Sequence, residues 1–442
     1  MKNVVFIFIL LWTNGTIYCQ HQIQDYLPQE PKPFSFEPKV PIRGQISGPS
    51  VYQPAYGNER MNRQNFDVSK YLDDYNREKM ARERMINQIT AEFEMERRKA
   101  NISYTFPHLI GVSGTEHYYM AQEELIKMAE GMIPLDLKRA IFVVENAFSK
   151  NELDYEWYNA VIERQVDIIK KYVVQSGYKS DNLSAKMWAL HQFLTDTIEI
   201  KDENGNLKFK NYPYKYDFDD PMGKQNWTMQ FVTKLISSGK GQCHSMPLYY
   251  LILAEELGVD AWLAYSPSHS YIKVKNAKGN MLNYETTNGH FVSDAWIQSG
   301  GYIKAEALRS KIYMDTLSRK QVLASMLADM AKGYGIKYGL DNFVLDCLNR
   351  ALKYHPNNIY ALSLKADYLT SLVNYVLPQL KIQKIDQILA YPEAYKIYQA
   401  MHDNYDKIDR MGLTEMPEAY YKEWLESCEA EKKRQPTESL KP

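Results

Sequence analysis

A proline near the start of an apolar run constrains the fold more than any other feature of this sequence. Residues Gly239–Gly258 read GKGQCHSMPLYYLILAEELG. Proline has no backbone N–H and is tolerated in a helix only within the first turn. A helix that contains Pro247 and runs through Leu257 must therefore begin close to Cys243. The glycines before this cysteine allow the chain a tight approach to the helix start.

The position of Cys243 favours chemistry but leaves several explanations open. Free N–H groups and the macrodipole at a helix start favour a thiolate and can stabilise an oxyanion. The cysteine is a packing residue, half of a disulfide, a metal ligand or a nucleophile. His244 and His290 are nearby in sequence, but the tight Cys/His spacing of a structural zinc site is absent. We therefore predict no metal and no cofactor.

After this helix the hydrophobic pattern changes from a helical period to that of strands. VDAWLAY predicts one strand, and HSYIKVK, NAKGN and MLNYETT predict a β-hairpin. If the loop Asn276–Asn280 closes the hairpin, Lys275 lies opposite Met281. Odd-numbered residues of both strands then share one face of the sheet.

This register brings an imidazole and a carboxylate together. Glu285 becomes the diagonal neighbour of His269, within reach of a long side chain. The other face carries apolar residues that suit the core: Ile272, Val274, Leu282 and Tyr284. A nucleophilic cysteine needs a base, and a carboxylate that orients the base completes a triad. We therefore predict Cys243, His269 and Glu285 as catalytic residues.

Three stretches also resemble a known family. GQC opening an apolar helix, SHSYIKV and NYETTNG are similar to the motifs of the transglutaminase-like superfamily, a papain-like cysteine fold. The resemblance covers about Asn226–Asn288. It implies Cys243 as nucleophile, His269 as base and Glu285 as acid, although the family usually has Asp at the last position. His244 stands where an aromatic residue is frequent in the family, and Trp227 or Gln225 is expected to supply a second oxyanion contact.

The chemistry implied by this resemblance is acyl transfer through an acyl-enzyme. Members of the superfamily include hydrolases, amide-crosslinking enzymes and inactive binding modules. We expect a cysteine-dependent amide hydrolase or acyltransferase that acts on a peptide or peptidoglycan-type amide. The alternative is an inactive interaction scaffold that binds a protein partner through helical repeats.

The C-terminal part resembles tetratricopeptide repeats. FVLDCLNRALKYHPNNIYALSLKADYLTSL places Val344, Leu348, Ala351 and Pro356 at the spacing of that repeat's second helix, and Leu362, Ala366 and Leu369 continue the pattern. We expect Pro378 to interrupt the next helix and at least two helices to follow. Such helices form a groove for a peptide or protein, or buttress a neighbouring domain. Cys347 and Cys428 are expected to pack between helices rather than to form a disulfide.

The N-terminus predicts export. MKNVVFIFILLWTNGTIYCQ has one lysine followed by an apolar run that is too short for a ~20-residue membrane span. We predict a signal peptide cleaved after Cys19 and a periplasmic or extracellular protein. Acylation of Cys19 as a lipoprotein is the alternative. We expect no transmembrane segment after the signal, and the balance of 53 basic and 54 acidic residues does not favour nucleic acid.

The predicted fold class is α+β, with a helix-plus-antiparallel-sheet core between two helical regions. We expect a signal peptide at 1–19, a Pro-rich tether at 20–66, helices at 67–200, the core at 201–318, repeat helices at 319–430 and a tail at 431–442. Within the first helical region, about Val68–Lys99 predicts a charged helix with Ile86, Ile89 and Phe93 near one face. This helix lies solvated on the body or serves as a coiled-coil partner site. A further helix is expected at Gln225–Ser237.

Overall fold

The structure is a computed structural model that describes residues 68–413, except 277 and 383, together with residue 426. The predicted signal peptide, the tether, the tail, Cys19 and Cys428 lie outside these residues. The chain divides into two units, and we treat each by itself. One contains helix α2, and the other, here called the main unit, begins at Ser103. The fold is mostly helical α+β with small sheets. Within the residues described, no helix is both long and apolar enough to span a membrane.

Helix α2 (Val68–Ala100) agrees with the predicted charged helix. Its sequence is rich in helix-forming charged residues and contains neither glycine nor proline. Ile86, Ile89 and Phe93 are exposed on this helix. Whether they serve a coiled-coil partner stays a prediction.

The main unit opens with helices α3 (Thr115–Ala129), α4 (Leu137–Phe148), α5 (Tyr155–Gln175) and α6 (Leu183–Thr195). The last three begin at polar caps, because Asp136, Asp154 and Asn182 each accept a backbone N–H three residues later. Each helix buries one apolar stripe, as the helical periodicity predicts.

The prediction that helix continues to Ile200 is wrong. Residues Ile198–Lys201 form strand β1, which pairs antiparallel with β2 (Leu207–Asn211). The turn explains the difference: the Asp202 carboxylate accepts the N–H groups of Asn204 and Asn206, and Gly205 has φ +83°. The dipeptide Asn204-Gly205 between short apolar segments is a hairpin signal, and the helical prediction did not take it into account.

The larger sheet holds the predicted hairpin. Its strands are β5 (Ala261–Ser266), β6 (His269–Lys275), β7 (Met281–Glu285) and β8 (His290–Val292), in that spatial order. Lys275 lies opposite Met281, so the predicted register is confirmed. Ile272, Val274 and Tyr284 are buried, as expected for the core face. Helix α8 (Ser245–Leu257) packs against β5 and β6 and is buried along most of its length.

The helix expected at Gln225–Ser237 is broken in two. A short 3-10 helix η3 (Trp227–Gln230) precedes α7 (Val232–Ser238), because Phe231 adopts an extended conformation with φ −85° and ψ 141°. The buried Glu145 carboxylate accepts the N–H groups of Val232 at 2.6 Å and Thr233 at 2.9 Å. A side chain from α4 therefore starts the second helix, and no local sequence signal predicts it.

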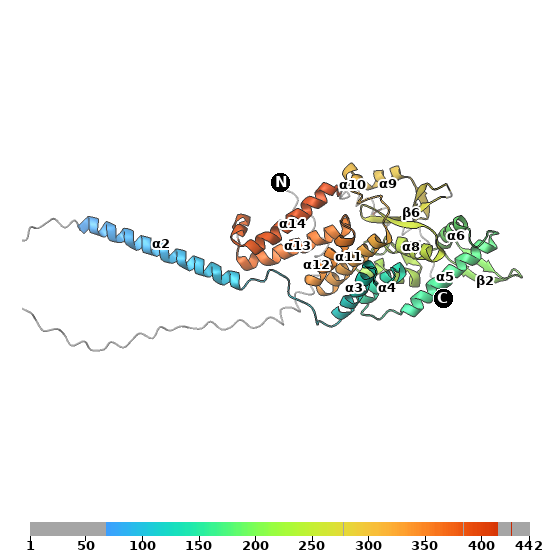
Figure 1. The fold of residues 1–442 in the computed structure, drawn as a ribbon, viewed down its shortest axis with the longest axis horizontal. Coiled ribbons are helices and arrows are strands. Elements are labelled where there is room, and N and C mark those ends of the chain that lie inside the picture. The colour runs from blue at the N-terminus through green and yellow to red at the C-terminus, as the bar shows by residue number, and fades with distance from the viewer. Residues whose placement is uncertain (1–67, 277, 383, 414–425, 427–442) are drawn as a thin grey trace, which may run out of the picture. The chain divides into compact units, whose positions relative to one another are not determined.

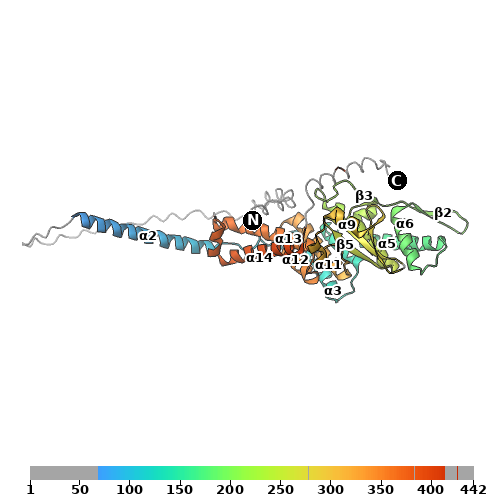
Figure 2. The same cartoon turned by 90° about the horizontal axis from the view of Figure 1, so that it is seen from above.

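The C-terminal helices follow one another in space as in sequence (Figure 1). After the short helices α9 (Asp294–Gly301) and α10 (Ala305–Arg309) come α11 (Arg319–Tyr338), α12 (Asn342–Tyr354), α13 (Ile359–Leu380), η4 (Ile385–Ala390) and α14 (Pro392–Met411). Figure 2 shows α11 to α14 from above. Helix α11 also packs against α3 and α4, so it joins this region to the first helices of the main unit.

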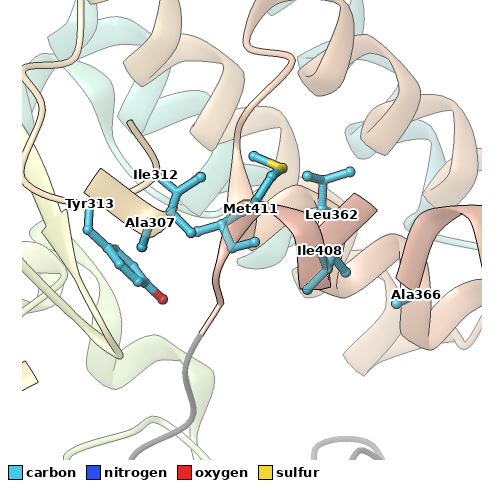
Figure 3. Close-up of a cluster of buried hydrophobic side chains, with 8 residues drawn as sticks. Ala307, Ile312, Tyr313, Leu362, Ala366, Ile408 and Met411 are labelled. Atoms are coloured by element: carbon cyan, nitrogen blue, oxygen red, sulfur yellow. The ribbon is translucent and has the colours of Figure 1, made fainter. Parts of the chain in front are cut away.

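The prediction that Pro378 interrupts a helix is wrong. Helix α13 continues through Pro378 and ends at Leu380. A proline this close to the helix end removes one hydrogen bond without stopping the helix. The predicted repeat stripe is buried: Leu362 and Ala366 pack against Ile408 and Met411 of α14 and against Ala307, Ile312 and Tyr313 (Figure 3). This stripe is therefore core and not the lining of a groove.

Candidate active site

The segment before Cys243 is held by the strand pair β3 (Lys215–Tyr216) and β4 (Lys240–Gly241), which is parallel. A Cβ at Gly241 would lie 2.7 Å from Leu235 Cδ1 and 2.9 Å from Ser245 Oγ, so any larger residue there would force these side chains to move. The tight approach predicted from the glycines is thus confirmed for Gly241. It brings the backbone against α7 and the start of α8.

Cys243 lies two residues before the first helical residue of α8. The Met246 N–H donates to the Gln242 carbonyl at 3.0 Å, and His244 is the residue before the first helical position. The helix therefore begins where Pro247 predicts. The first N–H groups of a helix have no acceptor within the helix, and they give this end of α8, next to Cys243, a positive partial charge.

Gln242 anchors this start. Its side chain is buried and its amide donates to the backbone carbonyls of Asp219 at 3.1 Å and Asp220 at 2.8 Å. Its carbonyl oxygen accepts from the Gln230 side chain. A fully bonded buried amide fixes the backbone on one side of the cysteine.

The predicted histidine and carboxylate meet. His269 Nε2 donates to Glu285 Oε2 at 2.7 Å, and the Glu285 side chain is only 3% exposed. The hydroxyl of Ser270 donates to the carbonyl of Cys243, which ties β6 to the start of α8. The His269 ring also shares a hydrogen bond with the Cys243 thiol. The structure thus brings all three predicted residues together.

The charges of these groups reinforce one another. Burial opposes ionisation of both Cys243 and His269. The hydrogen bond and the charge of His269 nevertheless lower the pKa of Cys243, and bonds to Cys243 and Glu285 raise the pKa of His269 to about 10. Both shifts favour a thiolate beside an imidazolium. Such a pair supplies a nucleophile and a proton donor to the same reaction.

The site is partly open to solvent. Cys243 is half-buried and the His269 side chain is 29% exposed, so neither residue is sealed from solvent. A cavity of about 220 Å³ lies elsewhere, between the second half of α8, β5 and α11, and is lined by Leu251, Trp262 and Arg319 among others. The reactive groups are therefore at the surface and not in this cavity.

The two residues expected to supply an oxyanion contact have other neighbours. Trp227 is buried in η3, and its ring lies 6.3 Å from that of His244 and 4.3 Å from Lys332 Nζ. Gln225 is exposed and its backbone N–H donates to Asp220 at 2.8 Å. An oxyanion contact from either residue stays a prediction.

Sequence reasoning missed the partners of His244. Its ring contacts Asp329 of α11 and the backbone of Gln230. Asp329 lies within a helical stretch with no motif around it, so no signal in the sequence connects it to the site. In the described part of the chain, no cluster of three or more His, Cys, Asp or Glu is arranged to hold a metal ion. Cys347 is a buried free thiol between helices, as predicted.

Comparisons with known proteins give no family. No family model matches the chain, and no curated protein does so. Among solved structures, the chain is similar to one described as "Crystal structure of menin reveals the binding site for Mixed Lineage Leukemia (MLL) protein". The TM-score is 0.34 and the identity 14%, over 67% of this chain and 68% of that one. A likeness this distant carries no argument about fold or function.

Proposed function

We propose that this chain is an exported cysteine-dependent amide hydrolase or acyltransferase of the transglutaminase-like type. In this proposal α8 and the sheet β5–β8 form the transglutaminase-like core, and α12 and α13 correspond to the tetratricopeptide-like part. The observation that carries the proposal is His269, which shares hydrogen bonds with Glu285 and with the Cys243 thiol. The order of nucleophile, base and acid along helix and strands also agrees with the motif resemblance.

The reaction follows from these groups. The Cys243 thiolate attacks the amide carbonyl carbon, and the charge that develops on oxygen is met by N–H groups at the start of α8. The His269 imidazolium donates its proton to the leaving nitrogen as the C–N bond breaks, which leaves a thioester. Water or an amine then gives a proton to His269 and attacks the thioester, and the C–S bond breaks to restore the thiolate.

Glu285 acts through His269. Its buried carboxylate orients the ring and stabilises the imidazolium, so the thiolate–imidazolium pair persists in the resting site. The substrate class, a peptide or peptidoglycan-type amide, rests on the family resemblance and on the proposed export.

The experiment is a screen of peptide and peptidoglycan-fragment amides with the full chain and with Cys243→Ala. We expect at least one amide to be cleaved or transferred by the wild type and none by the variant, with unchanged circular dichroism. An acyl-enzyme should be trapped as a mass increase on Cys243. If the wild type turns over no amide, or the variant is equally active, the enzyme proposal is wrong.

A second candidate function is an inactive scaffold that binds a protein partner. It is supported by Ile385 and Leu389, which are exposed on η4 next to α14. The face around Leu362–Leu369 does not suit a test of this function, because its side chains include buried core residues. The scaffold function predicts that a partner still binds Cys243→Ala but is lost when Ile385 and Leu389 are both changed to Ser. If that double variant retains the partner, the scaffold function does not use this face.

A further inference from the structure

Cys243 is followed directly by a second imidazole–carboxylate pair. His244 Nε2 lies 3.0 Å from Asp329 Oδ2, and His244 Nδ1 lies 3.2 Å from the carbonyl oxygen of Gln230. Asp329 comes from α11 and is 4% exposed. The pair is therefore built from two distant parts of the chain, with the carboxylate buried and the His244 side chain 32% exposed.

The partners of the His244 ring define its charge. A backbone carbonyl and a carboxylate both accept hydrogen bonds, so each ring nitrogen carries a proton. Burial disfavours the charged ring, but the charge and hydrogen bond of Asp329 outweigh burial and raise the pKa of His244 to about 9. With both N–H groups engaged, the ring cannot take the proton of the Cys243 thiol. Its role must differ from that of His269.

Other charged or titratable groups face this pair from three elements. Glu145 of α4 caps α7 and has its pKa raised by burial to about 7. Lys332 of α11 lies over the Trp227 ring, and burial lowers its pKa. Tyr360 of α13 faces Asp329, and burial and that charge raise its pKa. Of the two carboxylates near the His244 ring, Glu145 and Asp329, it is Asp329 that accepts a hydrogen bond from the ring.

We propose that the His244 imidazolium, held by Asp329, is a positioning residue that stabilises the Cys243 thiolate electrostatically. His244 follows the thiol in the chain, and its fixed cation adds to the His269 cation and to the N–H groups of α8. Helix α11 thereby contributes a group that the thiol site needs. The catalytic meaning of this inference rests on the proposed function, whereas the effect on the thiolate does not.

The test is the pH dependence of Cys243 alkylation by iodoacetamide in the full chain. Mass analysis of the tryptic peptide that begins at Gly241 reads Cys243 separately from the other cysteines. In His244→Gln and in Asp329→Asn we expect the alkylation midpoint to rise by about one pH unit, the size of one nearby charge in a partly shielded site. At pH values below both midpoints this is about a tenfold fall in rate.

A double variant distinguishes a coupled pair from two separate effects. When His244→Gln is already present, Asp329→Asn removes a negative charge and neutralises no cation. The midpoint should then stay or fall, although the same change raises it in the wild type. A rise of equal size in both backgrounds would show that Asp329 does not act through His244 and would overturn the proposal.

A purely structural pair gives a different result. His244→Gln would then lower the thermal transition and leave the alkylation midpoint unchanged, which overturns the proposal. The matched control is His402→Gln, an exposed histidine on α14, which should leave the midpoint unchanged. If the variants fail to fold, nitrogen NMR of the wild type decides: both His244 ring nitrogens should be protonated at pH 7.5, and a neutral ring refutes the inference.

The outcomes separate this inference from the proposed function. A raised midpoint in a chain that turns over no amide supports the His244–Asp329 pair and refutes the enzyme. An unchanged midpoint in an active enzyme refutes the pair and supports the enzyme.

Discussion

Replacing Glu285 with Gln tests how the buried carboxylate controls His269. The change keeps the size of the side chain and removes the charge that accepts from His269 Nε2 at 2.7 Å. The imidazolium loses a charge-assisted hydrogen bond and keeps its bond to the thiol. We therefore expect the pKa of His269 to fall from about 10.

The magnitude follows from the bond that is lost. A hydrogen bond to a charged group contributes about 1.5–3 kcal/mol. One pKa unit corresponds to about 1.4 kcal/mol, so the pKa of His269 should fall by about one to two units. The charge of Glu285 also repels the thiolate and slightly raises the pKa of Cys243. As the pH rises, the His269 imidazolium of the variant should therefore lose its proton at a lower pH than that of the wild type. The pKa of the Cys243 thiol should stay the same or fall slightly.

The same shift affects stability with a defined sign. His269 has a higher pKa in the folded chain than the unfolded value of about 6.5. Its stabilising contribution is therefore fully present below about pH 6.5 and is lost as the pH rises through about 10. In Glu285→Gln this stabilising contribution should be lost at a pH about one to two units lower than in the wild type.

The assay is nitrogen NMR of the histidine rings as a function of pH, with Glu393→Gln as control. Glu393 is an exposed carboxylate on α14 that pairs with Lys396, so its loss should leave His269 unchanged. If the midpoint of His269 is the same in wild type and Glu285→Gln, the carboxylate does not stabilise the imidazolium. The triad assignment of Glu285 would then be wrong.

Three further predictions use simpler measurements. His269→Ala removes the group that lowers the pKa of Cys243, so the alkylation midpoint should rise to about 8.5 or above; a midpoint that does not rise contradicts the ion pair. Gly241→Ala should reduce the free energy of unfolding in urea by about 1–3 kcal/mol, because its Cβ would lie 2.7 Å from Leu235. Leu362→Ala should cost about 2–5 kcal/mol in the same assay, whereas the exposed Leu389→Ala should cost little; equal losses would contradict the buried position of Leu362.

The sequence alone determined the local geometry around Cys243. Pro247 indicated the helix start because proline lacks the N–H that an interior helix position donates, and the structure has the helix start there. The five-residue loop of the hairpin set the pairing of Lys275 with Met281, and with it the meeting of His269 and Glu285. These inferences succeed because turn length and strand alternation act over a few residues.

Tertiary structure decided what no short segment encodes. The helix expected at Gln225–Ser237 breaks at Phe231 because the Glu145 carboxylate, far away in sequence, caps the second part. The repeat stripe at Leu362 is core because α14 and Ile312 cover it. The charge on His244 depends on Asp329, which reaches it only when α11 packs into place. Hydrophobic periodicity and turn signals do not indicate which side chains from distant parts of the chain come into contact. The contact that keeps the His244 ring charged beside the thiol therefore exists only in the folded chain.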